Sequence, residues 1–207
     1  MPPPVPPTAV APRVILLALG AILLAAPALA EAPPVAELGA FHGAWERVAV
    51  EEDDTTRLSA IDSAVSGLSW LKRKMAAPIL RATTSPPARY EFVVSEPALL
   101  FGERGKPPRP LPLDGTERRG EGPRGEFSAQ SRLIDGAIET EWVVEDARGS
   151  NRYTVTDGGE TLLVEHSIEI TALEGVEKFA YQTRFQRIPT VASAGPAEAS
   201  AQAAALD

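Results

Sequence analysis

The 207-residue chain contains no cysteine and only two histidines, His42 and His166. Without cysteine it forms no disulfide, so its stability must come from the hydrophobic core, and a zinc site lacks most of its usual ligands. The Gly-x-Ser-x-Gly and His-Glu-x-x-His motifs of hydrolases are also missing. These absences predict a non-catalytic protein without a metal or cofactor. A hydrolase or isomerase with its site at an open barrel mouth is the weaker alternative.

Basic residues are outnumbered: 20 lysines and arginines stand against 28 aspartates and glutamates, and the net charge is −8. An acidic chain repels a phosphate backbone, so we expect no nucleic-acid partner. The one long basic stretch is segment 103–124, which is rich in Pro, Gly and Arg and predicts a loop, with at most an edge strand at residues 111–113. This loop could attract an anionic ligand, or it could be an insertion without a function.

Long apolar runs are confined to the first thirty residues. An apolar run over 14–26 follows Arg13, and the small-residue motif Ala28-Leu29-Ala30 follows the run. This layout predicts a signal peptide over residues 1–30 that is cleaved after Ala30, and therefore a secreted or periplasmic protein. A membrane anchor is the rival, but the run is short for a span of about 20 residues, and Pro27 interrupts it.

The far end of the chain is poor in large apolar residues. Residues 189–207 are mostly Ala, Ser, Gly and Pro, so we expect a disordered tail. Residues 31–188 remain as one domain of ordinary size.

Within that domain, apolar and polar residues alternate over 137–145, 161–170 and 177–187. Successive side chains of a strand point to opposite faces, so each stretch predicts a strand with one buried and one wet face, as in antiparallel sheets. Further strands are predicted over 43–50, in a hairpin at 89–102 and on both sides of the Asp135-Gly136 turn. We expect turns over 146–151 and 157–159.

One amphipathic helix is predicted after the first strand, over about residues 55–80, with Asp54 or Thr55 as N-cap and Pro78 ending or kinking it. Its single apolar stripe consists of Leu58, Ile61, Val65, Leu68, Leu71 and Met75. The sum is a mainly β fold: an antiparallel meander of about eight strands that closes into a small soluble β-barrel. Charged outer faces argue against a membrane barrel.

The start Phe41-His42-Gly43-Ala44-Trp45 and the final 179–185 strand with its aromatics and Arg resemble lipocalins and related calycin barrels. The helix position departs from lipocalins, which carry theirs near the end, so bacterial secreted domains with a Gly-x-Trp start are more similar. The resemblance implies structural roles for Gly43 and Trp45, with Trp45 sealing one barrel end. It also implies that Arg184 or Arg187 packs across the Trp45 ring.

His166 is the only ionisable side chain on a clearly apolar strand face, where it could bond a ligand or be an ordinary core histidine. Other predicted inward residues could join it in a small ligand cavity, or they could simply fill the barrel. They are Thr140, Trp142, Phe179, Tyr181 and Thr183. We therefore expect a binding protein for a small apolar or amphipathic ligand. The alternative is an envelope structural or protein-interaction domain with a filled barrel.

Membrane contact is a further alternative. Trp70, Lys72, Arg73 and Lys74 could hold the predicted helix to an anionic surface, although such a charge run is more often a solvated face.

Overall fold

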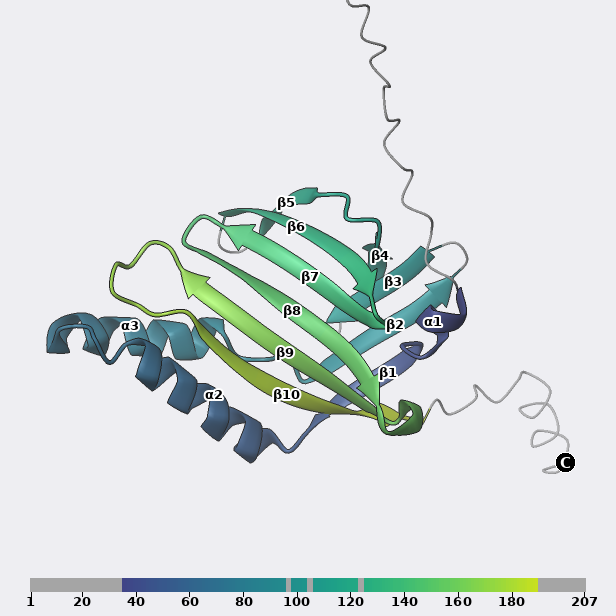
Figure 1. The fold of residues 1–207 in the computed structure, drawn as a ribbon, viewed down its shortest axis with the longest axis horizontal. Helices are drawn as coiled ribbons and strands as arrows, with labels where there is room; N and C mark the ends of the chain where they lie inside the picture. Colours follow the sequence, from purple (N-terminus) through teal and green to yellow (C-terminus); the bar gives the residue numbers. More distant parts are fainter. Residues whose placement is uncertain (1–34, 96–97, 104–105, 123–124, 190–207) are drawn as a thin grey trace, which may run out of the picture. The chain divides into compact units, whose positions relative to one another are not determined.

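A computed structural model describes residues 35–95, 98–103, 106–122 and 125–189 (Figure 1). The predicted signal peptide and nearly all of the predicted tail lie outside these described residues.

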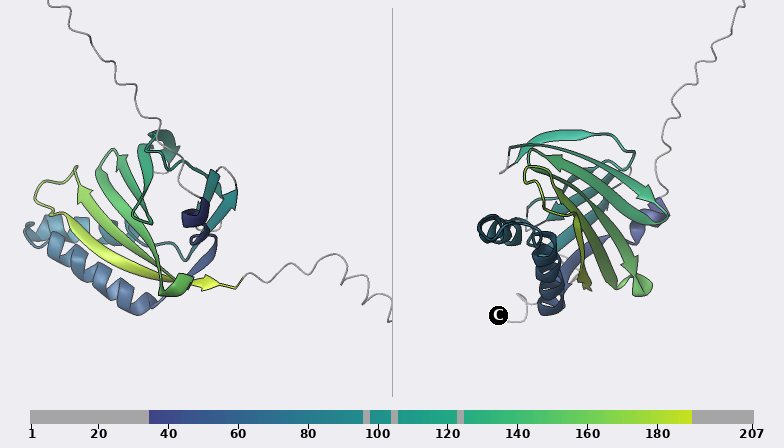
Figure 2. Two further views of the ribbon diagram at one scale, coloured as in Figure 1. Left: turned by 45° about the vertical axis from the view of Figure 1, so that its right-hand side comes forward. Right: turned by 60° about the vertical axis from the view of Figure 1, so that its left-hand side comes forward.

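One antiparallel sheet dominates the structure, in the order β4-β3-β2-β1-β10-β9-β8-β7-β6-β5. The sheet curls into a half-barrel, as two further views show (Figure 2). This mainly β, antiparallel arrangement confirms the predicted fold class. The strands are β1 (Gly43–Val48), β2 (Arg89–Ser95), β3 (Ala98–Glu103), β4 (Arg109–Leu111), β5 (Arg118–Gly122), β6 (Gly125–Ile134), β7 (Ala137–Val144), β8 (Ala147–Thr156), β9 (Thr161–Ile170) and β10 (Phe179–Ile188).

Two of the ten strands, β4 and β5, lie in segment 103–124, which was predicted to be a loop with at most an edge strand at residues 111–113. They form the two edges of the sheet, and the described residues contain no ladder between them. The predicted closed barrel is therefore wrong in this respect. β4 is only three residues long, and Pro110 within it has no backbone N–H to donate. Two contacts reach towards the gap: a bridge between Asp114 and Arg132, and a 3.4 Å bond from Arg118 Nη1 to the Pro110 carbonyl.

The single predicted helix is two helices, α2 (Val50–Ala64) and α3 (Trp70–Thr83), which follow a short α1 (Val35–Gly39). A 3-10 turn, η1 (Asp157–Gly159), occupies the turn predicted there. Ala49, in a left-handed conformation, precedes α2, so neither predicted N-cap begins the helix. Pro78 does not end α3, which continues to Thr83.

The turn between α2 and α3 divides the predicted apolar stripe. Ile61, Val65 and Leu68 are buried, whereas Leu71 and Met75 are exposed. A continuous helix would keep all five on one face, but the chain turns after Val65 and resets the helical phase. As a result, α3 buries Ala76, Ala77 and Leu80 instead.

The predicted alternation along the long strands is confirmed. The outward residues Glu139, Glu165 and Glu169 pair across strands with Arg152 or Arg148 on the wet face. The inward residues form two clusters that lie along β9 and β10. The first contains Trp45, Phe92, Leu162, Val164 and Phe185, and the second joins Ile168, Phe179 and Tyr181 to the two helices.

Within the described ranges, no helix is long and apolar enough to cross a membrane.

Candidate ligand-binding site

A pocket of about 160 Å³ lies beneath the segment that follows α3. Its sheet wall comes from β2, β7, β8, β9 and β10, and its outer wall from residues 83–87. Most of the lining is aromatic or aliphatic, and a few polar groups converge on it. The lining residues are Thr83, Thr84, Ser85, Pro86, Pro87, Tyr90, Trp142, Ala147, Asn151, His166, Ile168, Ile170 and Tyr181.

His166 lies on β9, where the two core clusters meet, and both of its ring nitrogens have partners. Nδ1 is 2.8 Å from Asn151 Oδ1, and Nε2 is 3.0 Å from Thr183 Oγ1. With the amide oxygen as the acceptor at Nδ1, Nε2 accepts from the Thr183 hydroxyl. Burial, with a smaller contribution from the nearby Arg47 charge, lowers the pKa of His166 to about 4. The imidazole is therefore neutral near pH 7.

Tyr181 packs on the His166 ring, with centroids 4.6 Å apart and an interplanar angle of 23°. Its hydroxyl donates a 2.8 Å hydrogen bond to the Thr84 carbonyl, which ties the segment after α3 to the sheet. Burial raises the pKa of Tyr181 to about 12, so this donor keeps its proton at physiological pH. The neutral His166 and Tyr181 rings thus form one side of the pocket.

Trp142 contributes another aromatic wall, and it depends on a glycine. Gly149 faces Trp142 across the β7–β8 ladder. A methyl group at Gly149 would overlap the Ser167 carbonyl and the Trp142 ring. Only glycine lets the indole approach the sheet this closely.

The six predicted ligand-site residues do not all meet at the pocket. His166, Trp142 and Tyr181 line it, and Thr183 lies behind His166 as its hydrogen-bond partner. Thr140 is outside the lining and bonds Ser131 at 2.9 Å. Phe179 is buried in the cluster that faces the helices.

Sequence reasoning missed Asn151 and the 83–87 wall. Residues 147–151 were predicted as part of a turn, but they begin β8, which places Asn151 directly opposite His166 in the ladder. A strand prediction there would have exposed this pairing. Pro86-Pro87 marks the end of the helical segment in the sequence, but it indicates no role in a pocket, because that role depends on where α3 ends.

The opposite end of the interior is closed by packed aromatic rings. Trp45, Phe41, Phe92 and Phe185 are fully buried there. Tyr90 lies against Phe185 with ring centroids 4.8 Å apart. The sequence left open whether the interior is filled by side chains or contains a ligand cavity. The structure has both: one end is filled, and the other has a small pocket.

At this filled end the residue over the Trp45 ring is Arg187, with its guanidinium carbon 4.2 Å from the ring centroid. Arg187 also donates to the carbonyls of Gly159 and Ala40, at 2.6 and 2.7 Å, and to that of His42. Gly43 has a φ of 126°, and a Cβ there would lie 3.1 Å from Arg187 Nη1. Gly43 therefore leaves room for the guanidinium.

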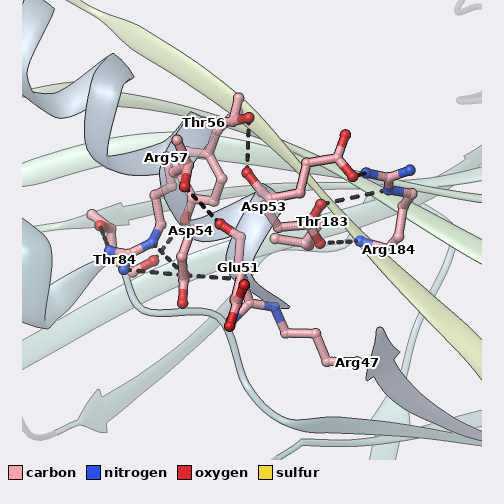
Figure 3. Close-up of polar contacts among 12 residues, drawn as sticks. Arg47, Glu51, Asp53, Asp54, Thr56, Arg57, Thr84, Thr183 and Arg184 are labelled. Carbon is pink, nitrogen blue, oxygen red and sulfur yellow. Dashed lines mark hydrogen bonds and ion pairs between the residues drawn. The ribbon is translucent and has the colours of Figure 1, made fainter. Parts of the chain in front are cut away.

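Arg184 does not stack on Trp45, which corrects one of the two residues that the resemblance implied. It lies on the opposite face of β10, where it pairs with Glu52 at 2.7 Å and with Asp53 at 3.5 Å. Its backbone N–H donates to Asp53 Oδ2 at 2.9 Å (Figure 3). The Asp53 carboxylate thus accepts a backbone N–H of β10 near the end of β1.

A second polar cluster joins α2 to the sheet (Figure 3). Arg47 and Arg57 both donate to Asp54 Oδ1, at 3.0 and 3.3 Å. Arg57 also bonds the Arg81 carbonyl at 2.9 Å and Thr84 Oγ1 at 3.3 Å. Despite partial desolvation, which opposes the shift, the two arginines lower the pKa of Asp54. This cluster fixes the start of α2 and the end of α3 beside the pocket.

The described residues contain no group of three or more His, Cys, Asp or Glu side chains that could hold a metal ion.

No protein-family model matches the chain, and no curated protein matches it significantly. Solved structures resemble it at low identity. A heat-soluble SAHS protein from Ramazzottius varieornatus is 11% identical, with a TM-score of 0.46 over 72% of this chain and 96% of that one. Fatty-acid-binding protein 1 of Echinococcus granulosus is 14% identical, with a TM-score of 0.44 over 72% and 98%. Zebrafish ileal bile-acid-binding protein, crystallised with cholic acid, is 12% identical, with a TM-score of 0.43 over 72% and 99%.

Proposed function

We propose that the protein binds a small apolar or amphipathic molecule without transforming it, in the pocket formed by Trp142, His166 and Tyr181. One observation supports this proposal above the others: aromatic and aliphatic side chains line one pocket together with a few polar groups, a combination that is usual for small-molecule sites. The hydrogen bonds of His166 orient its ring as a neutral wall of this pocket.

The chemistry of the walls indicates what part of a ligand they take. Both His166 nitrogens and the Tyr181 hydroxyl already have protein partners, so these residues offer ring faces more than free donors. Burial keeps His166 uncharged, so it attracts no anion near pH 7. The pocket therefore favours an uncharged ring or hydrocarbon group.

The volume limits how much of the ligand is enclosed. An apolar cavity of about 150 Å³ holds one benzene molecule, so a pocket of about 160 Å³ takes one ring or a short chain. A longer amphiphile would extend past residues 83–87 towards solvent or would displace them. Displacement would break the bond between the Tyr181 hydroxyl and the Thr84 carbonyl.

The filled aromatic end supports a second candidate function, an envelope structural or protein-interaction domain. In that role the small pocket would be a packing defect without a ligand. Both candidates place the protein outside the cytoplasm, because we also propose that residues 1–30 are a signal peptide cleaved after Ala30.

Native mass spectrometry of the protein purified from its host tests these proposals together. We expect the measured mass to match a chain that starts at Glu31. A second peak should carry the additional mass of a small apolar molecule that the protein retained. The recovered molecule is then titrated against the wild type and two variants, with tryptophan emission as the readout. His166→Leu should weaken binding about tenfold or more, because loss of the stacked imidazole reshapes the pocket.

Thr140→Val is the matched control, since Thr140 also faces inward but is outside the pocket lining. It should leave the affinity unchanged. If no small molecule is retained and a broad panel of apolar compounds shifts neither emission nor melting temperature, the ligand-binding proposal is wrong and the interaction domain is favoured.

A further inference from the structure

Helix α3 has two apolar faces. Ala76, Ala77 and Leu80 are buried against the rest of the domain. On the other side, Leu71, Met75 and Ile79 recur every four residues and remain 60%, 65% and 59% exposed. Trp70, at the start of the helix, is 72% exposed. Such a set of large apolar side chains on one helix face is more than the scattered exposure of ordinary surfaces.

The charge on α3 is of one sign. The helix contains Lys72, Arg73, Lys74 and Arg81 and no acidic residue, although the whole chain has a net charge of −8. Arg73 bonds the carbonyls of Ser66 and Leu68, and Arg81 pairs with Asp62 at 2.7 Å. In the described part of the chain, no carboxylate pairs with Lys72 or Lys74. Lys74 Nζ lies 5.1 Å from the centroid of the Trp70 ring.

We propose that this α3 outer face, made of Leu71, Met75 and Ile79 and flanked by Trp70, Lys72 and Lys74, docks onto the surface of an anionic lipid bilayer. A helix with large apolar residues on one face and lysines beside them lies in the plane of the membrane interface. Apolar side chains enter the boundary of headgroups and acyl chains, while lysines meet the negative surface potential. Trp70 suits this boundary because its ring is amphipathic.

Charge complementarity favours a bilayer over a second copy of the chain. Two copies joined through this face would bring the unpaired Lys72 and Lys74 of each close to those of the other, and like charges repel. An anionic bilayer attracts the same lysines at every contact. Segment 103–124 is also basic, but it contains four acidic residues, whereas α3 contains none and adds exposed large apolar side chains.

The position of α3 gives this docking a consequence that rests on the proposed function. The helix ends at Thr83, and Thr83 and Thr84 line the pocket. A bilayer held against α3 would therefore lie near the 83–87 wall of the proposed pocket.

Tryptophan quenching tests the docking locally, so binding through another part of the full chain does not confuse it. Full-length protein is mixed with vesicles of phosphatidylcholine alone or with a third of phosphatidylglycerol, and both carry brominated acyl chains. Trp45 and Trp142 are buried or half-buried, so the exposed Trp70 is the ring that can meet bromine. We expect quenching with the anionic vesicles only, and its loss in Trp70→Phe.

Two glutamate variants provide a matched comparison. Met75→Glu places a negative charge within the α3 outer face and should lower the vesicle affinity about tenfold or more. Val143→Glu makes the same kind of change at another exposed apolar site and should leave it unchanged. Replacing Lys72 and Lys74 with Gln should lower affinity roughly fivefold per charge, and high salt should do the same. Both altered sites are exposed, and unchanged melting temperatures confirm that the variants fold.

Equal quenching of the wild type and Trp70→Phe would overturn the proposal, as would equal affinity for neutral and anionic vesicles or equal effects of Met75→Glu and Val143→Glu. Self-association that Met75→Glu abolishes, without vesicle binding, would assign the face to a second copy. The proposed pocket is unaffected by these outcomes, because ligand affinity is measured without vesicles.

Discussion

At the residue scale, His166 and Tyr181 find their hydrogen-bond partners within the protein. His166 bonds Asn151 and Thr183, and Tyr181 bonds the Thr84 carbonyl. Buried polar groups that lack partners cost about 1–3 kcal/mol each, so such pairing is what a stable interior requires. The pairs also orient the two rings of the pocket. The core-histidine reading and the ligand-site reading of His166 are therefore compatible, since one ring can serve both.

The neutral state of His166 predicts a pH-dependent stability. Its folded pKa is about 4, below the ordinary value of 6.5. Above pH 6.5 the imidazole is neutral in both states, and the folded state keeps its full stability. As the pH falls from 6.5 to about 4, the unfolded chain binds a proton that the folded chain does not. We expect the free energy of unfolding to fall by about 3 kcal/mol over this window and then to level off.

Urea denaturation from pH 7.5 to 4 measures this effect, with His166→Gln as the comparison. Carboxylates titrate in both proteins, so the difference between the two stability curves isolates His166. A difference that stays constant with pH would show that His166 is protonated as readily in the folded protein as in the unfolded chain.

Residue-level prediction from the sequence succeeded where face alternation decides position. Trp142, His166 and Tyr181 were assigned to inward faces, and all three line the pocket. The same alternation places Arg184 on the wet face of its strand and Arg187 with the inward residues. It therefore already predicts that Arg187, and not Arg184, stacks on Trp45. Asn151 was missed because the boundary of β8 was placed too late.

At the element scale, strands were predictable and helices less so. The alternation of a strand is local, and β7, β9 and β10 carry it along their length, whereas the first half of β8 does not. The helical stripe from Leu58 to Met75 also has correct local spacing, yet the chain turns at 65–69 and breaks the stripe. Periodicity cannot detect such a turn, because it depends on α3 packing back onto the domain. The exposed face of α3 follows directly from that break.

The start of α2 offers a test of what fixes an element boundary. Ala49 has a φ of 51° and a ψ of 36°, and its carbonyl accepts the Asp53 N–H at 3.0 Å. A left-handed conformation costs an alanine about 1–2 kcal/mol, whereas glycine adopts it freely. Ala49→Gly should therefore raise the free energy of unfolding by about 1 kcal/mol, measured by urea denaturation.

Ala60→Gly makes the same chemical change inside α2, where the backbone is helical. It should lower the free energy of unfolding by about 1 kcal/mol, because glycine is a poor helix former. Opposite signs at the two positions are the expected result. A loss of stability at both would mean that Ala49 is not left-handed in solution.

At the scale of the whole molecule, the sequence predicted the antiparallel sheet but not its open edge. Closure of the barrel depends on whether the two edge strands come close enough to form a ladder. No local sequence pattern indicates the distance between them. The short β4 with Pro110, and the side-chain contact of Arg118 across the gap, take the place of a ladder. The Pro-, Gly- and Arg-rich composition of residues 103–124 does set this segment apart. It corresponds to two edge strands and the connection between them instead of a plain loop.

Amide hydrogen exchange separates an open sheet from a closed barrel. Strands β8 and β9 have ladders on both sides, so their amides open only with most of the domain and should exchange slowest. Strand β5 has a ladder only to β6, and β4 only to β3, so half of their backbone groups face the gap. We expect peptides covering 109–122 to exchange at least about a hundredfold faster than those covering 147–170, as edges open by local fraying. Equal protection of the two regions would mean that β4 and β5 pair in solution and that the barrel predicted from the sequence closes after all.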